Sequence, residues 1–119
     1  MNAGTEPVEP TPDEVDVVVE VFRMLADPTR VRLLWALRDG ELPVNELAER
    51  VGKPAPGVSQ HLAKLRLARL VQTRRQGTQV FYRAENQHVM QLVTDAVHHA
   101  DHLGNEVPRH HRGAHGATA

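Results

Sequence analysis

Residues 44–66 constrain the fold of this chain more than any other segment, because they read as two short helices joined by a tight turn. The first helix is predicted to end at Gly52, and the second is predicted to begin near Pro54–Pro56 and to continue to Arg66. Two short helices separated by a glycine-containing turn are typical of a helix-turn-helix. Apolar residues at helical spacing predict the buried side of the second helix: Val58, Leu62 and Leu65.

The opposite face of this second helix is polar and basic and carries no carboxylate. Such a face suits the major groove of DNA, where amide, hydroxyl and cationic side chains bond to base edges. The predicted DNA-contacting residues of the helix are Pro56, Ser59, Gln60, His61 and Lys64. A packing or solvated role is the alternative for His61, because that is the usual role of a single histidine on a helix.

Two strands are predicted directly after the helix, at residues 70–75 and 79–83, around the turn Gln76–Gly77. A basic hairpin in this position is typical of the wing of a winged helix-turn-helix. The wing residues predicted to contact phosphates or the minor groove are Arg74, Arg75 and Gln79. The alternative is an exposed hairpin whose charge only improves solubility.

The distribution of charge supports a nucleic-acid partner. The whole chain has a net charge of −1, but the segment from Lys53 to Arg83 carries +7 and contains no Asp or Glu, so the remainder carries −8. A solvated protein surface usually interleaves both signs of charge. A separation this sharp in a small chain indicates that one surface meets a polyanion.

The remaining segments complete one domain. Two helices are predicted before the helix-turn-helix and one long helix, ended by Gly104, is predicted after the hairpin. The expected fold is therefore mainly α with a small β-hairpin, in the order ααααββα, over residues 13–103. Residues 1–12 are predicted to be a flexible arm, and residues 104–119 a flexible histidine-rich tail.

Composition excludes several classes of protein. The 119 residues suit one small domain or half of an intertwined dimer. No apolar run approaches the roughly 20 residues of a membrane helix, and the first residues do not resemble a signal peptide, so a cytoplasmic protein is expected. We see no nucleophile motif, phosphate-binding loop or acid pair, and therefore do not expect an enzyme. The absence of cysteine leaves only nitrogen and oxygen ligands for any metal.

The last predicted helix concentrates such ligands. Seven of the eight histidines lie between Glu85 and His115. On a helical wheel, one arc of the helix is apolar, and the opposite arc carries His88, Gln91, Asp95, His98, His99 and His102. This pattern predicts one face that is buried and one face that presents possible metal ligands.

Helix geometry predicts that such a metal site is shared between two chains. His88 and His99 are eleven residues apart, which is about 16 Å along a helix at ~1.5 Å per residue, so they cannot bind one ion within one chain. Antiparallel pairing of two copies of the helix would bring His88 of one chain near His99 and His102 of the other. The pairs His99–His102 and His98–His102 each have a spacing that permits chelation.

Three sequence segments resemble a known family. They are Met24–Leu34, Glu46–Ala48 and Val58–Leu65, and together with the order of elements they resemble the ArsR/SmtB family of bacterial metal-responsive regulators over about residues 15–103. The resemblance implies a homodimer formed through the first and last helices. It also implies binding to double-stranded operator DNA, with an affinity that changes when metal binds at the dimer interface.

The resemblance also distinguishes between the metal sites of the family. Its thiolate site requires cysteines where this chain has Pro43 and Asn45, so that site is absent. Its zinc site begins with Asp-x-His, where this chain has Asn86-Gln87-His88, whereas the later ligand positions match His99 and His102. Loss of the first carboxylate argues against a standard tetrahedral Zn(II) site.

Within the family, the chain is most similar to sensors of nickel and cobalt. That similarity implies a ligand set of His88, Asp101, His102, His110 and His111. Five or six nitrogen and oxygen ligands suit Ni(II) or Co(II) better than Zn(II), although Zn(II) remains an alternative effector. The sequence leaves open whether His99 or Asp101 joins His88 and His102.

The expected function is therefore a nickel- or cobalt-responsive repressor that binds an inverted repeat as a homodimer. The residues do not determine the sign of the metal effect, so a metal-assisted DNA binder or an activator is an alternative. A winged-helix regulator that responds to a non-metal signal is a second alternative. A metal carrier or storage protein with a vestigial DNA-binding fold is a more remote one.

Overall fold

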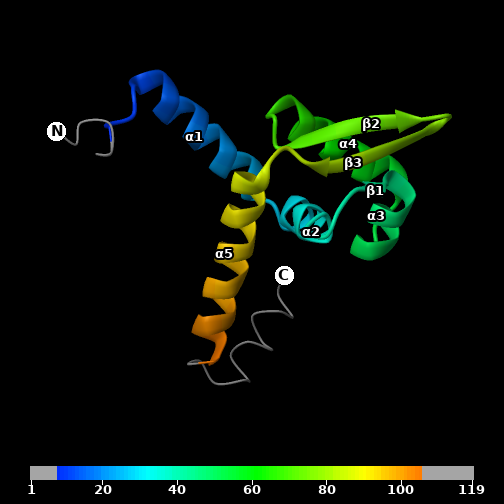
Figure 1. Ribbon diagram of the computed structural model, residues 1–119. Helices are drawn as coiled ribbons and strands as arrows, with labels where there is room; N and C mark the ends of the chain where they lie inside the picture. Colours follow the sequence, from blue (N-terminus) through cyan, green and yellow to red (C-terminus); the bar gives the residue numbers. More distant parts are fainter. Residues whose placement is uncertain (1–7, 106–119) are drawn as a thin grey trace.

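The computed structural model describes residues 8–105 of the chain (Figure 1). The elements of this part of the chain are α1 (Pro12–Leu25), α2 (Pro28–Ala36), β1 (Leu42–Pro43), α3 (Val44–Val51), α4 (Ala55–Leu67), β2 (Val71–Gln76), β3 (Gln79–Ala84) and α5 (Gln87–Asn105). The order confirms the expected winged helix-turn-helix, with one additional short strand, β1.

Local hydrogen bonds determine where α1 begins. The Thr11 hydroxyl accepts a bond from the Glu14 N–H at 3.1 Å, and the Thr11 N–H donates to the Glu14 carboxylate at 2.9 Å. This reciprocal capping box pairs two polar groups that would otherwise lack partners at the helix end. Pro12 occupies the first turn, where its missing N–H costs nothing.

Asp27 separates α1 from α2 and caps the second helix. Its carboxylate accepts a bond from the Arg30 N–H at 3.0 Å. Burial opposes ionisation of Asp27, but the Arg30 N–H, the Arg30 guanidinium and the nearby His61 outweigh it, so the pKa of Asp27 lies below the ordinary value of 3.8. The folded state therefore favours the ionised cap.

Replacing Asp27 with alanine is expected to lower the free energy of unfolding at neutral pH by about 1 kcal/mol, the usual cost of losing an N-cap. Because the pKa of the carboxyl is depressed in the folded state, its stabilising effect is complete above its ordinary pKa and is lost as the pH falls through the folded value. Urea titrations at neutral pH and at about pH 3 measure both effects. Asp27→Asn, which keeps a capping side chain, is the control, and its free energy of unfolding should fall less. Equal decreases in the two variants would contradict the capping role.

The turn between α3 and α4 depends on Gly52. This residue has a φ of 67° in the left-handed region, which favours glycine, and it follows the last residue of α3. The next residue, Lys53, donates its N–H to the Ala48 carbonyl at 3.1 Å. These features reverse the chain and allow α4 to pack across α3.

The hydrophobic core lies between the helices and the base of the sheet. In α4, Val58, Leu62 and Leu65 are fully buried, as their spacing predicts. From the last helix, Val93 is the buried residue. The apolar core residues in the described part of the chain are Leu33, Leu34, Ala36, Leu37, Leu47, Ala48, Val51, Val58, Leu62, Leu65, Leu70, Val71 and Val93. The core therefore holds α2, α3 and α4 together and leaves α1 largely outside.

The sheet has three antiparallel strands in the order β1-β3-β2. The hairpin pairs Thr73 with Tyr82 and Gln76 with Gln79, and β1 adds Leu42 opposite Tyr82. Strand β1 was not predicted, because two residues give no periodic pattern. An available signal was Pro43, since the residue before a proline favours an extended conformation.

Helix α5 begins with Asn86 as its cap, whose side-chain oxygen accepts the Val89 N–H at 3.1 Å. Within the described residues it continues through Gly104 to Asn105, so the prediction that Gly104 ends the helix is wrong. Glycine permits the end of a helix without requiring it. The tail from residue 106 onward and most of the N-terminal arm lie outside the described residues.

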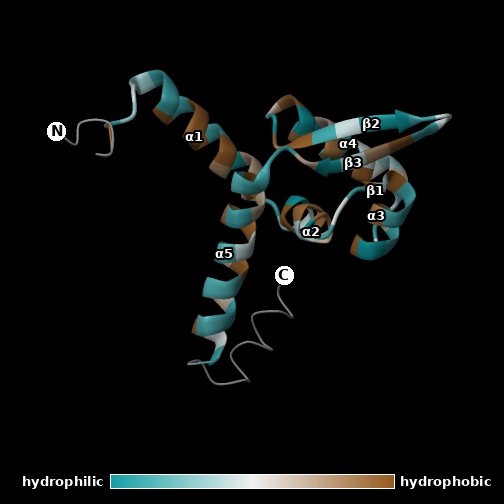
Figure 2. Cartoon of the chain, viewed as in Figure 1, coloured by the Kyte–Doolittle hydropathy of each residue, from teal (hydrophilic) through white to brown (hydrophobic). Residues whose placement is uncertain are grey.

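Helices α1 and α5 extend away from the body formed by α2, α3, α4 and the sheet (Figure 1). Apolar residues lie along both extended helices (Figure 2). Those that remain exposed are Val15, Val17, Val18, Val19, Phe22, Leu92 and Leu103. The apolar arc predicted for α5 is thus only partly covered within one chain. No helix within residues 8–105 is long and apolar enough to cross a membrane.

Candidate DNA-binding surface and metal-ligand residues

The outer face of α4 is available to a partner. Its inner residues are buried, and this fixes the rotation of the helix. The exposed residues among those predicted to contact DNA are Pro56, Ser59, Gln60 and Lys64. The face carries amide, hydroxyl and ammonium groups without a carboxylate, which are the groups that bond to base edges and phosphates.

His61 is less exposed than the other predicted DNA contacts of α4. It is half-buried, and its Nδ1 is 3.3 Å from Nη1 of Arg30. Arg30 also donates from Nε to the Met24 carbonyl at 2.8 Å, so it links the end of α1 to α4. This geometry favours the packing alternative for His61 over a contact with DNA.

The two wing arginines have different surroundings. Arg74 Nε donates to both carboxylate oxygens of Glu41, at 3.0 and 3.1 Å, and Nη2 also contacts that carboxylate. Its Nη1 donates to Gln76 at 2.7 Å, and its guanidinium lies 4.8 Å from the centre of the Phe81 ring. The bond from Arg74 holds the pKa of Glu41 below its usual value. The Arg74 guanidinium is therefore already paired with groups of its own chain.

Arg75 is exposed and follows Arg74 in β2. Side chains of successive strand residues point to opposite faces of a sheet, so the two arginines do not share their surroundings. Gln79, the other wing residue predicted to contact DNA, is also exposed at the start of β3. Arg75 and Gln79 are thus better placed than Arg74 for a phosphate contact.

Arg75→Ala is expected to weaken DNA binding more than Arg74→Ala. A free guanidinium can bind phosphate directly, whereas Arg74 must first leave Glu41. Each lost phosphate contact should reduce the slope of log affinity against log salt by about 1. Titrating a labelled duplex at several salt concentrations measures this slope for both variants. An equal reduction of the slope in both would show that DNA binding releases Arg74 from Glu41.

The candidate metal ligands of α5 are exposed at two separate parts of the helix. His88 lies in the first turn, and His99, Asp101 and His102 lie in the last turns. Within residues 8–105, no three histidine or acidic side chains come close enough together to hold one metal ion. His110 and His111 lie outside the described residues. The donors within residues 8–105 are therefore separated, and a site with three of them would need donors from outside this part of the chain.

Comparison with known proteins identifies the family. The model of the arsR family of bacterial regulatory proteins matches residues 27–73. The HTH-type transcriptional regulator KmtR of Mycobacterium tuberculosis is 69% identical over 91% of this chain and 84% of its own length. The chain belongs to the ArsR family. It is a DNA-binding transcriptional regulator and not an enzyme, as the sequence predicted.

Two solved structures support the same fold. A homodimeric winged helix-turn-helix DNA-binding domain from Mycobacterium bovis has a TM-score of 0.74 and 29% identity, and covers 85% of this chain and 94% of its own. The transcriptional repressor BigR from Xylella fastidiosa has a TM-score of 0.65 and 35% identity, with 70% and 85% covered. The regulator NmtR of M. tuberculosis is 40% identical over 72% of each chain.

Two long-range contacts beside the candidate DNA-binding residues of this ArsR-family chain were not predicted from the sequence. Glu41 neutralises Arg74 from outside the basic segment, and Arg30 links α1, α2 and α4. Neither contact has a local sequence signal, because the partners are 33 and 31 residues apart. The acidic residue immediately before Leu42-Pro43 becomes informative only when β1 is known to lie beside the hairpin.

Proposed function

We propose that this chain is a homodimeric repressor whose affinity for operator DNA is controlled by Ni(II) or Co(II) bound to donors on α5. The observation that carries the proposal is the arrangement of α5: exposed nitrogen and oxygen ligands lie on the same helix as an apolar stripe that its own chain leaves partly uncovered. The identity with KmtR and NmtR supports the same class of regulator.

Dimerisation through α1 and α5 would cover the exposed apolar side chains. On α1, Val18 is 48% exposed and Phe22 is 55% exposed, and α1 contains no buried residue. On α5, Leu103 is 48% exposed. Burying a side chain of this size contributes about 1.5–3 kcal/mol relative to full exposure, so a second copy would stabilise both helices substantially. The M. bovis relative, which is homodimeric, supports the association of two copies.

The dimer would also unite ligands that one chain keeps apart. His88 of one chain, with His102 and either His99 or Asp101 of the other, supplies a nitrogen-rich set without sulfur, and His110 and His111 would complete it from the tail. Such a set fits Ni(II) or Co(II), which favour imidazole and carboxylate ligands and more than four of them. The bound ion would supply a cross-link between the two subunits.

Metal would act on DNA binding by changing the relative orientation of the two α4 helices. A ligand shifts such an equilibrium only by the difference in its affinity for the two forms, typically about 1–3 kcal/mol. Release of DNA on metal binding is the direction we propose. The operator would be an inverted repeat with half-sites about one helical turn apart.

Fluorescence anisotropy with metal-free, full-length protein tests the proposal. A labelled duplex from upstream of the protein's own gene is titrated without metal and with Ni(II), Co(II) or Zn(II). We expect Ni(II) and Co(II) to weaken binding by about 5–150-fold, the range of typical coupling energies, and Zn(II) to act less. Tighter binding with metal would identify a metal-assisted binder, and no effect of any metal would refute the sensor.

A further inference from the structure

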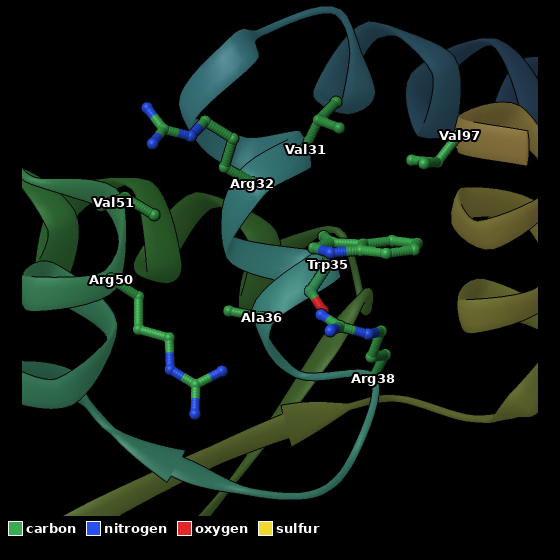
Figure 3. Close-up of a pocket in the computed structure, with 8 residues that line it drawn as sticks. All are labelled: Val31, Arg32, Trp35, Ala36, Arg38, Arg50, Val51 and Val97. Atoms are coloured by element: carbon green, nitrogen blue, oxygen red, sulfur yellow. The ribbon is translucent and has the colours of Figure 1, made fainter. Parts of the chain in front are cut away.

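A cavity of about 400 Å³ lies beside α2, between α3 and α5 (Figure 3). This volume falls in the range of small-molecule sites, about 300–1,000 Å³. Its lining residues are Val31, Arg32, Trp35, Ala36, Arg38, Arg50, Val51 and Val97. They include none of the candidate DNA contacts or metal ligands, so the cavity is separate from both surfaces described above.

An aromatic wall forms one side of the cavity. The half-buried indole of Trp35 extends from α2 toward α5, where Val97 lies opposite (Figure 3). The Arg38 guanidinium lies 4.3 Å from the indole centre and donates to the Trp35 carbonyl at 2.9 Å. These contacts hold the ring in place, so a flat apolar group could pack against a surface that is already oriented.

The polar groups of the cavity are cationic. Arg32, Arg38 and Arg50 line it, and no carboxylate does. Among residues 8–105, no ion pair involves Arg32 or Arg50, and Arg38 has only the distant Asp39 carboxylate at 3.9 Å. In Figure 3, Arg38 lies on the segment that follows α2, and Arg50 extends from α3 toward the same end of that helix. Guanidinium groups beside an apolar wall favour a carboxylate attached to an apolar body.

We propose that this cavity binds a small organic monoanion, with an aromatic body against Trp35 and Val97 and a carboxylate at Arg50 and Arg38. The apolar wall excludes a strongly hydrated inorganic ion as the preferred ligand, and the three cations disfavour an amine. The cavity joins α3 of the helix-turn-helix to α5. A ligand that prefers one spacing of these helices therefore biases the DNA-binding form independently of metal.

The only tryptophan in the chain, Trp35, reports directly on the cavity. Metal-free, full-length protein in EDTA is titrated with phenylacetate, and tryptophan emission is followed. We expect a saturable change with a Kd on the order of 1 mM, because a ligand with few heavy atoms can form only a small contact area. Phenylacetamide has the same shape without the charge and should bind about tenfold more weakly, because it lacks charge-assisted hydrogen bonds.

Two matched variants locate the binding site. Arg50→Gln should weaken phenylacetate binding about tenfold, whereas Arg66→Gln, which removes the same charge from an exposed residue of α4, should leave it unchanged. Thermal melting establishes that both variants fold, as their exposed positions predict. The proposal is overturned if phenylacetate produces no saturable change, if phenylacetamide binds equally well, or if both variants bind as the native protein does. Because metal is absent throughout, failure here leaves the proposed metal response untouched.

Discussion

Replacing His88 with alanine is expected to abolish the effect of Ni(II) or Co(II) on operator binding while leaving the metal-free affinity within about twofold. His88 is exposed in the first turn of α5 and is not one of the candidate DNA contacts, so its loss should remove a metal donor without changing the DNA-binding face. Altering groups that only support metal ligands typically costs 10–100-fold in affinity, so loss of a ligand should cost at least about tenfold. Anisotropy titrations with and without metal measure both quantities.

His98→Ala is the matched control for His88→Ala. His98 lies on the same helix and is also exposed, but the resemblance to nickel and cobalt sensors does not include it among the ligands. The control should retain the metal response. If His98→Ala lost the response and His88→Ala kept it, the ligand assignment would be wrong and the chelating pair His98–His102 would take its place.

Replacing Gln60 with alanine is expected to lower affinity for the specific operator by about 5–150-fold and to change affinity for unrelated DNA little. A glutamine on a recognition helix can form two hydrogen bonds with one base, worth about 1–3 kcal/mol of discrimination. Gln60 is exposed on α4, beside the buried residues that fix the helix, so truncation should not alter the fold. Parallel titrations with operator and scrambled duplexes measure the loss of specificity.

Gln91→Ala controls for the loss of an exposed glutamine elsewhere. Gln91 lies on α5 and bonds to Asp95 at 2.8 Å, so its truncation should leave DNA binding by the metal-free protein unchanged. Arg75→Ala provides a second comparison, because loss of a phosphate contact should weaken binding to both duplexes equally. A Gln60→Ala variant that weakened both duplexes equally would show that Gln60 positions the helix and does not read a base.

Most of the fold follows from patterns that lie close together in the chain. The spacing of Val58, Leu62 and Leu65 predicted the buried side of α4, and Gly52 predicted the turn before it. Thr11 and Asp27 predicted the starts of α1 and α2, because a helix cap acts over three residues. The short strand β1 escaped prediction, since two residues cannot establish a period.

The candidate sites were less predictable because their properties depend on distant contacts. The local pattern predicted equivalent roles for Arg74 and Arg75, yet only Arg74 forms an ion pair with Glu41. Similarly, His61 shares a helix with the exposed Gln60 but faces Arg30. The cavity at Trp35 had no sequence signal, because its walls come from α2, α3 and α5.

The order of the helices and the hairpin, the absence of thiolate ligands, the basic segment and the family could be predicted before any tertiary contact was known. These properties depend on residue type and short spacing, which hydrogen bonds within a helix and hydrophobic periodicity convert directly into structure. The tertiary structure was needed to show which wing arginine pairs with a carboxylate and which apolar side chains of residues 8–105 stay uncovered. Those properties depend on contacts between residues that are far apart in the sequence, and such contacts form only when the whole chain packs.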